Sequence, residues 1–194
     1  MKTTVLVLVA ACLAGTACAA AERVDDALDF SAWYTGVSGG WLLPGCGNTL
    51  SRAGEVSFRV GRSFGDEVCA WELDAACAPT VGTHDGHEAL TGLASRGLYH
   101  LNGFEEFDRL FGCERFDPFV SAGGALRFGA RHAFADRSHR TALGPTVGLG
   151  AFYHLTDNLS LRFDMQAMLA VDSPCGLLCS AGLGLQWTFG GSGE

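Results

Sequence analysis

The sequence predicts an all-β fold, an eight-stranded antiparallel up-and-down transmembrane β-barrel with a packed polar lumen. Three observations predict it. Apolar and polar residues alternate in eight segments, each about 9 to 12 residues long, the length that a tilted strand needs to cross a bilayer. The connections between the segments alternate in length, and aromatic residues stand near the segment ends.

The first 21 residues have the order of a secretory signal peptide. Lys2 precedes an apolar stretch from Thr4 to Leu13, and small residues follow as far as Ala21. A lipoprotein with a lipidated Cys12 or Cys18 is the alternative. We expect a removed signal peptide at 1–21, a short periplasmic lead-in at 22–30, the barrel at 31–190 and a flexible tail at 191–194.

Charge excludes one class of partner. The chain has 21 acidic residues against 13 lysines and arginines, and its one lysine lies in the signal peptide. Phosphate binding calls for a basic face, so no nucleic acid partner is expected. No cofactor is expected either.

Four alternating segments lie in the first half. Their apolar sides hold Trp33, Val37 and Trp41; Val56, Phe58 and Val60; Trp71, Leu73 and Ala75; and, around residues 93 to 102, Tyr99 and Leu101. Their polar sides hold Tyr34 and Ser38; Ser57, Arg59 and Gly61; Glu72 and Asp74; and Arg96 and His100.

Four clearer segments lie in the second half. Their apolar sides hold Val120, Leu126 and Phe128; Val147, Leu149, Tyr153 and Leu155; Leu159, Leu161, Phe163 and Met165; and Leu183, Leu185, Trp187 and Phe189. Their polar sides hold Ser121 and Arg127; Thr146 and His154; Ser160, Arg162, Asp164 and Gln166; and Gln186 and Thr188.

The connections orient the predicted barrel. Residues 65–67 and 156–158 read as tight turns, and the links near 44–54, 78–92, 129–143 and 172–178 are longer and mostly polar. Short periplasmic turns and longer outer loops are typical of outer-membrane barrels. The link 103–117 should be short but spans about 15 residues, among them Phe104, Phe107, Leu110 and Phe111. There we expect a short amphipathic helix at the inner interface or against the barrel base.

A soluble β-sandwich also alternates, so the content of the polar side must discriminate. That side is rich in glycine with single charged residues, which suits the crowded lumen of an eight-stranded barrel. The sequence therefore favours a membrane barrel over a sandwich.

Three stretches, "DPFVSAGGALRF", "GPTVGLGAFYHLTDNLSLRFDMQAMLAV" and "SAGLGLQWTFG", resemble the OmpA-like outer-membrane β-barrel family over about residues 117–190. Residues 31–103 match only in their alternating pattern. The resemblance implies an eight-stranded barrel in the bacterial outer membrane. The cysteines and the five residues after Phe189 depart from the family pattern, and the family's peptidoglycan-binding domain, with its cell-wall anchoring role, does not carry over.

These observations set the expected partners. An exported outer-membrane barrel would contact outer-membrane lipids and lipopolysaccharide, and the barrel-assembly machinery during insertion. A partner of the external loops is not identified by the sequence.

Seven charged residues fall on the lumen side. Buried charges must be paired to be tolerated, so we expect an internal salt-bridge network, with a proton or small-ion path as the alternative. The seven are Arg59, Glu72, Asp74, Arg96, Arg127, Arg162 and Asp164.

His154 and Thr156 are a weak catalytic candidate. The stretch resembles the lipid A deacylases, eight-stranded barrels in which a histidine activates a serine with the help of an acid. Thr156 stands where the serine would be, in a turn assigned to the periplasmic end, the wrong end for lipid A of the outer leaflet. We therefore expect no enzyme and interpret His154 as a lumen-filling residue.

Histidines and cysteines give further candidates. His84 and His87, in the link 78–92, could bind a metal ion, although we interpret them as solvated loop residues.

Six cysteines remain after processing, and an even number in an exported chain favours disulfides. The predicted topology puts Cys69 and Cys113 toward the periplasmic end, so we expect a disulfide between them. The other four cysteines fall toward the outer end. There we expect a disulfide between Cys175 and Cys179, or pairings in which these two are exchanged with Cys46 and Cys77.

The leading hypothesis is a barrel with a structural or surface-interaction role in the cell envelope. The alternatives are a hydrolase acting on lipid A or phospholipid, and a narrow pore.

Overall fold

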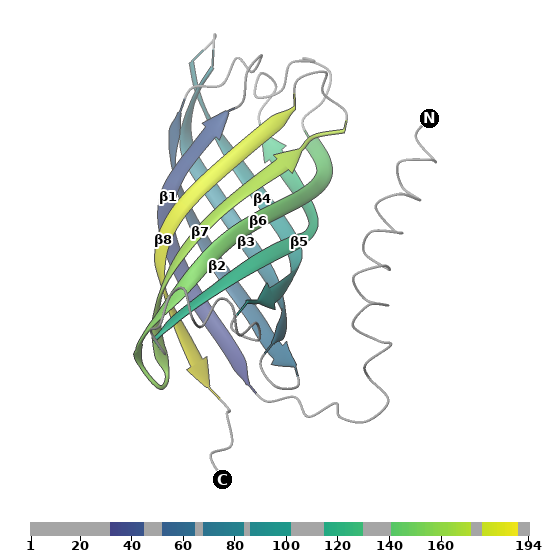
Figure 1. Ribbon diagram of the computed structural model, residues 1–194. Coiled ribbons are helices and arrows are strands. Elements are labelled where there is room, and N and C mark those ends of the chain that lie inside the picture. Colours follow the sequence, from purple (N-terminus) through teal and green to yellow (C-terminus); the bar gives the residue numbers. More distant parts are fainter. Residues whose placement is uncertain are drawn as a thin grey trace.

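The computed structural model describes residues 32–44, 52–64, 68–83, 86–101, 115–129, 141–171 and 176–189. They form a closed barrel in which each strand pairs antiparallel with its sequence neighbours and the last strand closes on the first (Figure 1). The strands are β1 (Trp33–Pro44), β2 (Ala53–Phe64), β3 (Cys69–Thr83), β4 (Gly86–His100), β5 (Phe116–Gly129), β6 (Thr141–Thr156), β7 (Leu159–Leu169) and β8 (Leu177–Phe189). The predicted eight-stranded fold is confirmed.

The barrel has two ends, which differ in what they connect. β1 begins and β8 ends at the end drawn lowest in Figure 1, here called the lower end. β2, β4 and β6 end at this lower end and β3, β5 and β7 begin there, whereas β1, β3, β5 and β7 end at the upper end. The described residues include no helix long and apolar enough to cross a membrane.

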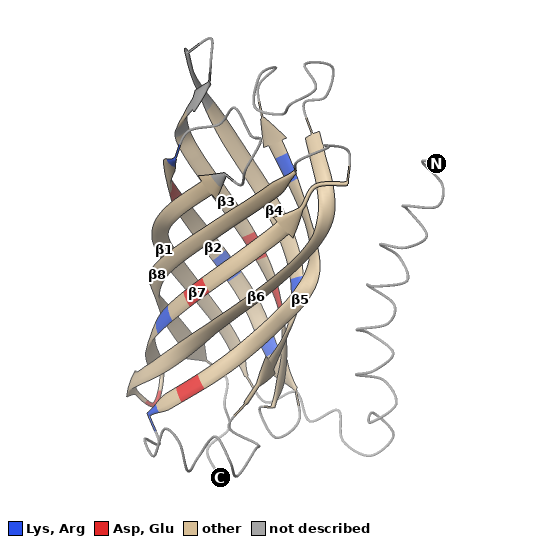
Figure 2. Ribbon diagram, turned by 45° about the horizontal axis from the view of Figure 1, so that its top comes forward, with Lys and Arg blue, Asp and Glu red and all other residues tan. Residues whose placement is uncertain are grey.

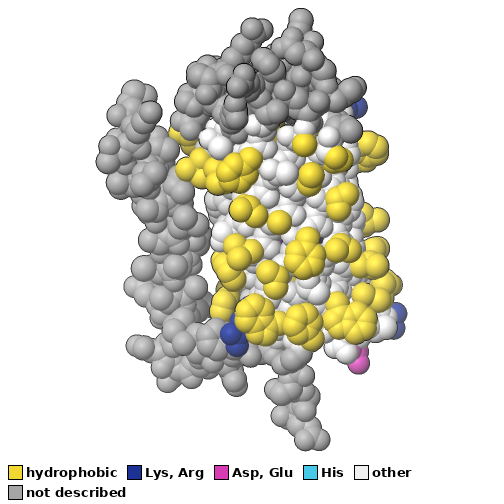
Figure 3. Space-filling view, turned by 180° about the vertical axis from the view of Figure 1, so that it is seen from behind, with side chains coloured by type: hydrophobic (Ala, Val, Ile, Leu, Met, Phe, Trp, Pro, Cys, Tyr) yellow, Lys and Arg dark blue, Asp and Glu magenta, His cyan; other side chains and the backbone are white. Residues whose placement is uncertain are grey.

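Alternation decides which side chains face outward. Val56 and Phe58 on β2 are 62% and 53% exposed, whereas Ser57 between them is buried. Leu161 stands between Tyr153 and Leu185 in the register, so apolar side chains meet apolar neighbours across strands. Figure 3 shows the result on one face, where hydrophobic side chains are spread over the wall and the visible charged ones lie near the ends.

The predicted link at 78–92 is wrong, because most of it is strand. β3 runs to Thr83 and β4 begins at Gly86, and both have 15 residues, longer than expected. The register shifts between Ala78 and Val81, so Pro79 sits at a bulge, where a missing backbone donor is tolerated. Val81 beyond the bulge is fully buried.

This extension also moves one predicted metal ligand. His87 lies in β4, paired with Gly82, and not in a loop. His84 lies outside the described residues. The fourth strand, expected around residues 93 to 102, starts seven residues earlier than the sequence suggested and ends at His100.

The tight turn at 156–158 is observed. β6 ends at Thr156, the turn contains Asp157 and Asn158, and β7 starts at Leu159. The Thr156 hydroxyl accepts a hydrogen bond from the Leu159 backbone N–H at 3.1 Å, which closes the turn.

Other predictions fall outside the described residues. These are the signal peptide, the lead-in, the tail, the turn at 65–67 and the helix expected within 103–117.

Two clusters of buried apolar side chains lie in the interior, one toward each end of the barrel. The upper cluster comprises Leu42, Ala53, Ala78, Val81, Leu90, Ala125, Ala142, Met168, Ala170 and Leu178. The lower cluster comprises Tyr34, Ala70, Leu98, Phe119 and Phe152. Between these two clusters lie the buried charged residues Arg59, Glu72, Asp74, Arg96, Arg162 and Asp164.

Candidate functional site

Six charged side chains meet in the middle of the lumen and form what we call the central cluster. They come from four strands, β2, β3, β4 and β7, and Figure 2 shows such charged positions as short segments on otherwise uncharged strands. Each residue is at most 4% exposed. The members are Arg59, Glu72, Asp74, Arg96, Arg162 and Asp164.

Arg162 clamps Glu72 from the opposite wall of the barrel. Its Nη1 and Nη2 donate to the two carboxylate oxygens at 2.7 and 3.1 Å. Nη2 also donates to Asp164 at 2.8 Å, and Nη1 donates to Gln186 at 3.2 Å. Two-point contact between a guanidinium and a carboxylate is among the strongest charge-assisted arrangements.

Asp164 collects all three arginines of the cluster. One carboxylate oxygen, Oδ2, lies 3.1 Å from Arg59, 3.2 Å from Arg96 and 2.8 Å from Arg162. Arg96 also pairs with Glu72, and Arg59 donates to the Ser38 hydroxyl at 2.6 Å.

The central cluster is balanced in charge. Three arginines face three carboxylates, and Arg96 lies 3.2 Å from the third carboxylate, Asp74. The opposite charges of such a cluster offset one another, and its hydrogen bonds join side chains from opposite walls. The cluster therefore favours packing over transport.

Arg127 does not join the central cluster. It pairs with Glu55 instead, with Nη1 2.5 Å from a carboxylate oxygen. Gly92 makes room for this side chain, because a Cβ at Gly92 would lie 2.5 Å from Arg127 Cδ. The predicted network is thus divided into two groups. Glu55 was missed, although it lies two residues before Ser57 and alternation places it on the same lumen side.

The lower cluster caps the charges with aromatic rings. The Arg162 guanidinium lies 4.7 Å from the Phe119 ring centroid and 5.0 Å from that of Phe152. The Tyr34 hydroxyl donates to Glu72 at 3.2 Å. His100 stacks on Phe152 at 5.6 Å between ring centroids.

Two histidines of the lower end have separate partners. His100 Nδ1 lies 2.6 Å from Asp117, and His154 Nδ1 lies 2.9 Å from the Ser160 hydroxyl. Ser160 is 4% exposed. Thr156, the predicted partner of His154, instead holds the turn described above, so the recorded contacts do not bring those two side chains together.

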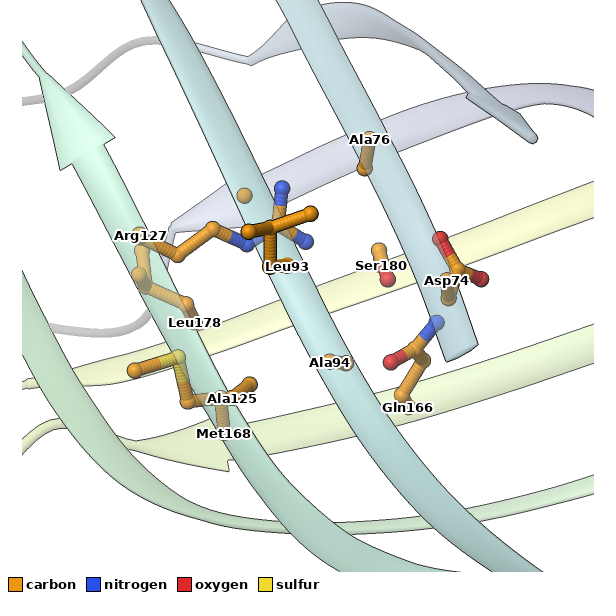
Figure 4. Close-up of a pocket in the computed structure, with 11 residues that line it drawn as sticks. Asp74, Ala76, Leu93, Ala94, Ala125, Arg127, Gln166, Met168, Leu178 and Ser180 are labelled. Atoms are coloured by element: carbon orange, nitrogen blue, oxygen red, sulfur yellow. The ribbon is translucent and has the colours of Figure 1, made fainter. Parts of the chain in front are cut away.

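The upper cluster closes the other end. Between it and the central cluster lies a cavity of about 20 Å³, which has room for one water molecule. Figure 4 shows Asp74, Gln166 and Ser180 on one side of this cavity and Arg127 and Met168 on the other. A second cavity of the same size shares Gln166 and Ser180. Both cavities are lined by groups of the lumen itself.

The cysteine and metal candidates are only partly described. Cys77 and Cys179 form no disulfide in the described part of the chain. Both lie on the outward-facing side, beside Val56 and Leu43 in the register. The predicted exchange that would join Cys77 to Cys179 is therefore wrong. The other predicted pairings involve Cys46, Cys113 or Cys175, which lie outside the described residues, so they stay predictions. The described residues contain no group of three or more side chains arranged to hold a metal ion.

No family model and no curated protein sequence matches the chain. Solved structures match its fold. Neisserial surface protein A aligns over 81% of this chain and 96% of its own, with a TM-score of 0.52 and 13% identity. The fold is that of the eight-stranded outer-membrane barrels.

Two further barrels align over 82% of this chain. Outer membrane protein W of Escherichia coli is covered over 98% of its length, with a TM-score of 0.52 and 11% identity. Ail, the attachment invasion locus protein of Yersinia pestis, in complex with the heparin analogue sucrose octasulfate, is covered over 97%, with a TM-score of 0.51 and 10% identity. Identities this low establish a shared fold alone.

Proposed function

We propose that this protein is an integral barrel of the bacterial outer membrane with a structural or surface-interaction role. The observation that carries the proposal is the closed lumen: a charge-balanced cluster, buried between two apolar clusters, inside a wall whose outer face is apolar. A barrel with a filled lumen is better suited to anchoring external loops than to conducting ions or solutes.

The outer face supports insertion in a membrane. Leu149, Leu183 and Val147 are 54% to 60% exposed on strands long enough to cross a bilayer. Soluble monomers rarely expose continuous apolar patches larger than a few hundred Å². Trp33 and Trp187 stand near the lower ends of β1 and β8, as interfacial aromatic residues do.

Location in the outer membrane is supported by the sequence and by the comparison with solved structures. The OmpA-like resemblance over residues 117–190, the signal-peptide pattern and the shared fold of outer-membrane proteins all favour it. In that membrane the lower end, with the tight turn at 156–158, would face the periplasm.

The proposal is tested by fractionation and gel mobility. The full chain, expressed in a Gram-negative host, should reach the outer-membrane fraction and migrate differently before and after boiling, because a barrel stays folded in cold detergent. A soluble sandwich should do neither, so recovery in the soluble fraction with unchanged mobility would refute the proposal.

A hydrolase acting on membrane lipid is the second candidate, carried by the hydrogen bond between His154 and Ser160. A base beside a hydroxyl is the core of nucleophilic catalysis. The burial of Ser160 weighs against it, because a lipid carbonyl would have to enter the closed lower end to reach that oxygen.

A further inference from the structure

An apolar groove runs over the outer wall of the barrel across β2 to β6. It has a volume of about 380 Å³. Large side chains form its edges, among them Phe58, Leu73, Leu93 and Leu126. This groove lies outside the lumen.

Small residues create the groove. In the register, Ser95 on β4 stands between Leu73 and Gly124, and Ala75 on β3 stands between Phe58 and Leu93. No atom lies within 4 Å of the position that a Cβ of Gly124 would occupy. The outer surface is therefore recessed at these positions, between larger side chains.

The polar groups lining the groove are already satisfied. The Ser95 hydroxyl accepts a hydrogen bond from the Trp71 indole N–H at 3.0 Å. Asp74 contributes to the lining, but its carboxylate is held in the lumen by Arg96 at 3.2 Å. The groove thus offers hydrocarbon contact and calls for an occupant without hydrogen-bonding groups.

We propose that this groove binds one acyl chain of a membrane phospholipid. The proposal rests on the proposed membrane location, because the groove is continuous with the apolar outer face. Trp71, two residues after the lower end of β3, is 38% exposed beside it. An interfacial tryptophan lies at headgroup level, so a lipid of the periplasmic leaflet, which is phospholipid, would lay its chain from Trp71 toward Gly124.

A second copy of the chain fits the groove less well. A neighbouring barrel presents a convex wall, which would rest on protruding side chains such as Leu73 and Leu93, 44% and 55% exposed. The floor at Gly124 would remain uncovered. A slender, flexible chain can follow the floor and gain dispersion contacts along it.

Two matched variants test the groove. Gly124→Leu should fill it and should leave the fold intact, because no atom lies within 4 Å of the Cβ position. Gly39→Leu is the control, because Gly39 also faces outward with no atom within 4 Å of its Cβ position, but it lies on β1 outside the groove. Both variants add the same side chain to the outer face.

The measurement is native mass spectrometry of the full-length protein with added phosphatidylethanolamine. After the detergent is removed, the wild type and Gly39→Leu should each retain one bound phospholipid. The fraction of Gly124→Leu that retains a phospholipid should be about tenfold lower. Equal retention by all three proteins would overturn the proposal. So would a groove-dependent dimer, or groove-dependent retention of lipopolysaccharide in place of phospholipid.

The outcome is separable from that of the proposed function. A protein that reaches the outer membrane and is heat-modifiable but retains no groove-dependent phospholipid would refute the groove alone. A protein found in the soluble fraction would refute the membrane location itself.

Discussion

Arg162 on β7 and Glu72 on β3 are joined across the lumen by two hydrogen bonds, 2.7 and 3.1 Å long, although 90 residues separate them in the sequence. Neither β7 nor its pairing partners β6 and β8 pairs with β3. This clamp therefore ties opposite walls of the barrel together through side chains, in addition to the backbone ladder.

Removing one partner of the clamp should be strongly destabilising. Glu72→Gln leaves Arg162 and Arg96 with a missing counter-charge in a buried site, and breaking such a pair typically costs about 3 to 5 kcal/mol. Urea unfolding in lipid vesicles, followed by fluorescence of the outward-facing tryptophans, gives the free energy of unfolding.

The double variant Glu72→Gln with Arg162→Met separates charge balance from loss of contacts. It should recover part of the loss, because the pair is removed together and the charge stays balanced, with Arg59 and Arg96 still facing Asp74 and Asp164. Strictly additive losses would contradict a coupled clamp.

The pair formed by Arg127 and Glu55 should behave independently of the clamp. The two groups share no recorded partner, and distant sites are usually additive within about 0.5 kcal/mol. Arg127→Met should therefore lower the free energy of unfolding by the same amount in the wild type and in Glu72→Gln. A clear interaction energy in the same urea assay would mean that the lumen charges form one network.

Gly92 and Gly97 lie on the same strand and should differ in their tolerance of alanine. A methyl group at Gly92 would meet Arg127 at 2.5 Å, whereas at Gly97 the recorded neighbour is a backbone oxygen at 4.0 Å. Gly92→Ala should lower stability by about 1 to 3 kcal/mol, the usual cost of overpacking. Gly97→Ala should be close to neutral, and similar effects of the two would contradict the position of Arg127.

The closed lumen should not conduct. Ions would have to pass the upper cluster, the central cluster and the lower aromatic cluster in turn, and the described cavities between them hold about one water each. Planar-bilayer recordings of the purified protein should show no discrete steps. Reproducible steps that respond to Arg96→Ala would favour the pore hypothesis.

Alternation predicted the facing of the strands because it depends only on local pleating. The mostly polar residues 78–92 predicted a loop, but a bulge between Ala78 and Val81 lets β3 continue past Pro79. The partners of each charge could not be predicted. Asp164 pairs with three arginines, whereas Arg127 pairs with Glu55. These pairings depend on strand tilt and register around the closed barrel, which cannot be inferred from any single segment.

The histidine at the lower end separates the structural from the enzymatic hypothesis. If His154 only fills the lumen, then His154→Ala and Ser160→Ala should leave the lipid A and phospholipid of an overexpressing strain unchanged relative to the wild-type protein. Thr156→Ala should cost about 1 kcal/mol through its lost turn hydrogen bond, again without a change in lipid. Mass spectrometry of extracted lipid makes the comparison. New deacylated species with the wild-type protein that disappear with both His154→Ala and Ser160→Ala, while both variants remain heat-modifiable, would establish a catalytic pair and overturn the structural interpretation.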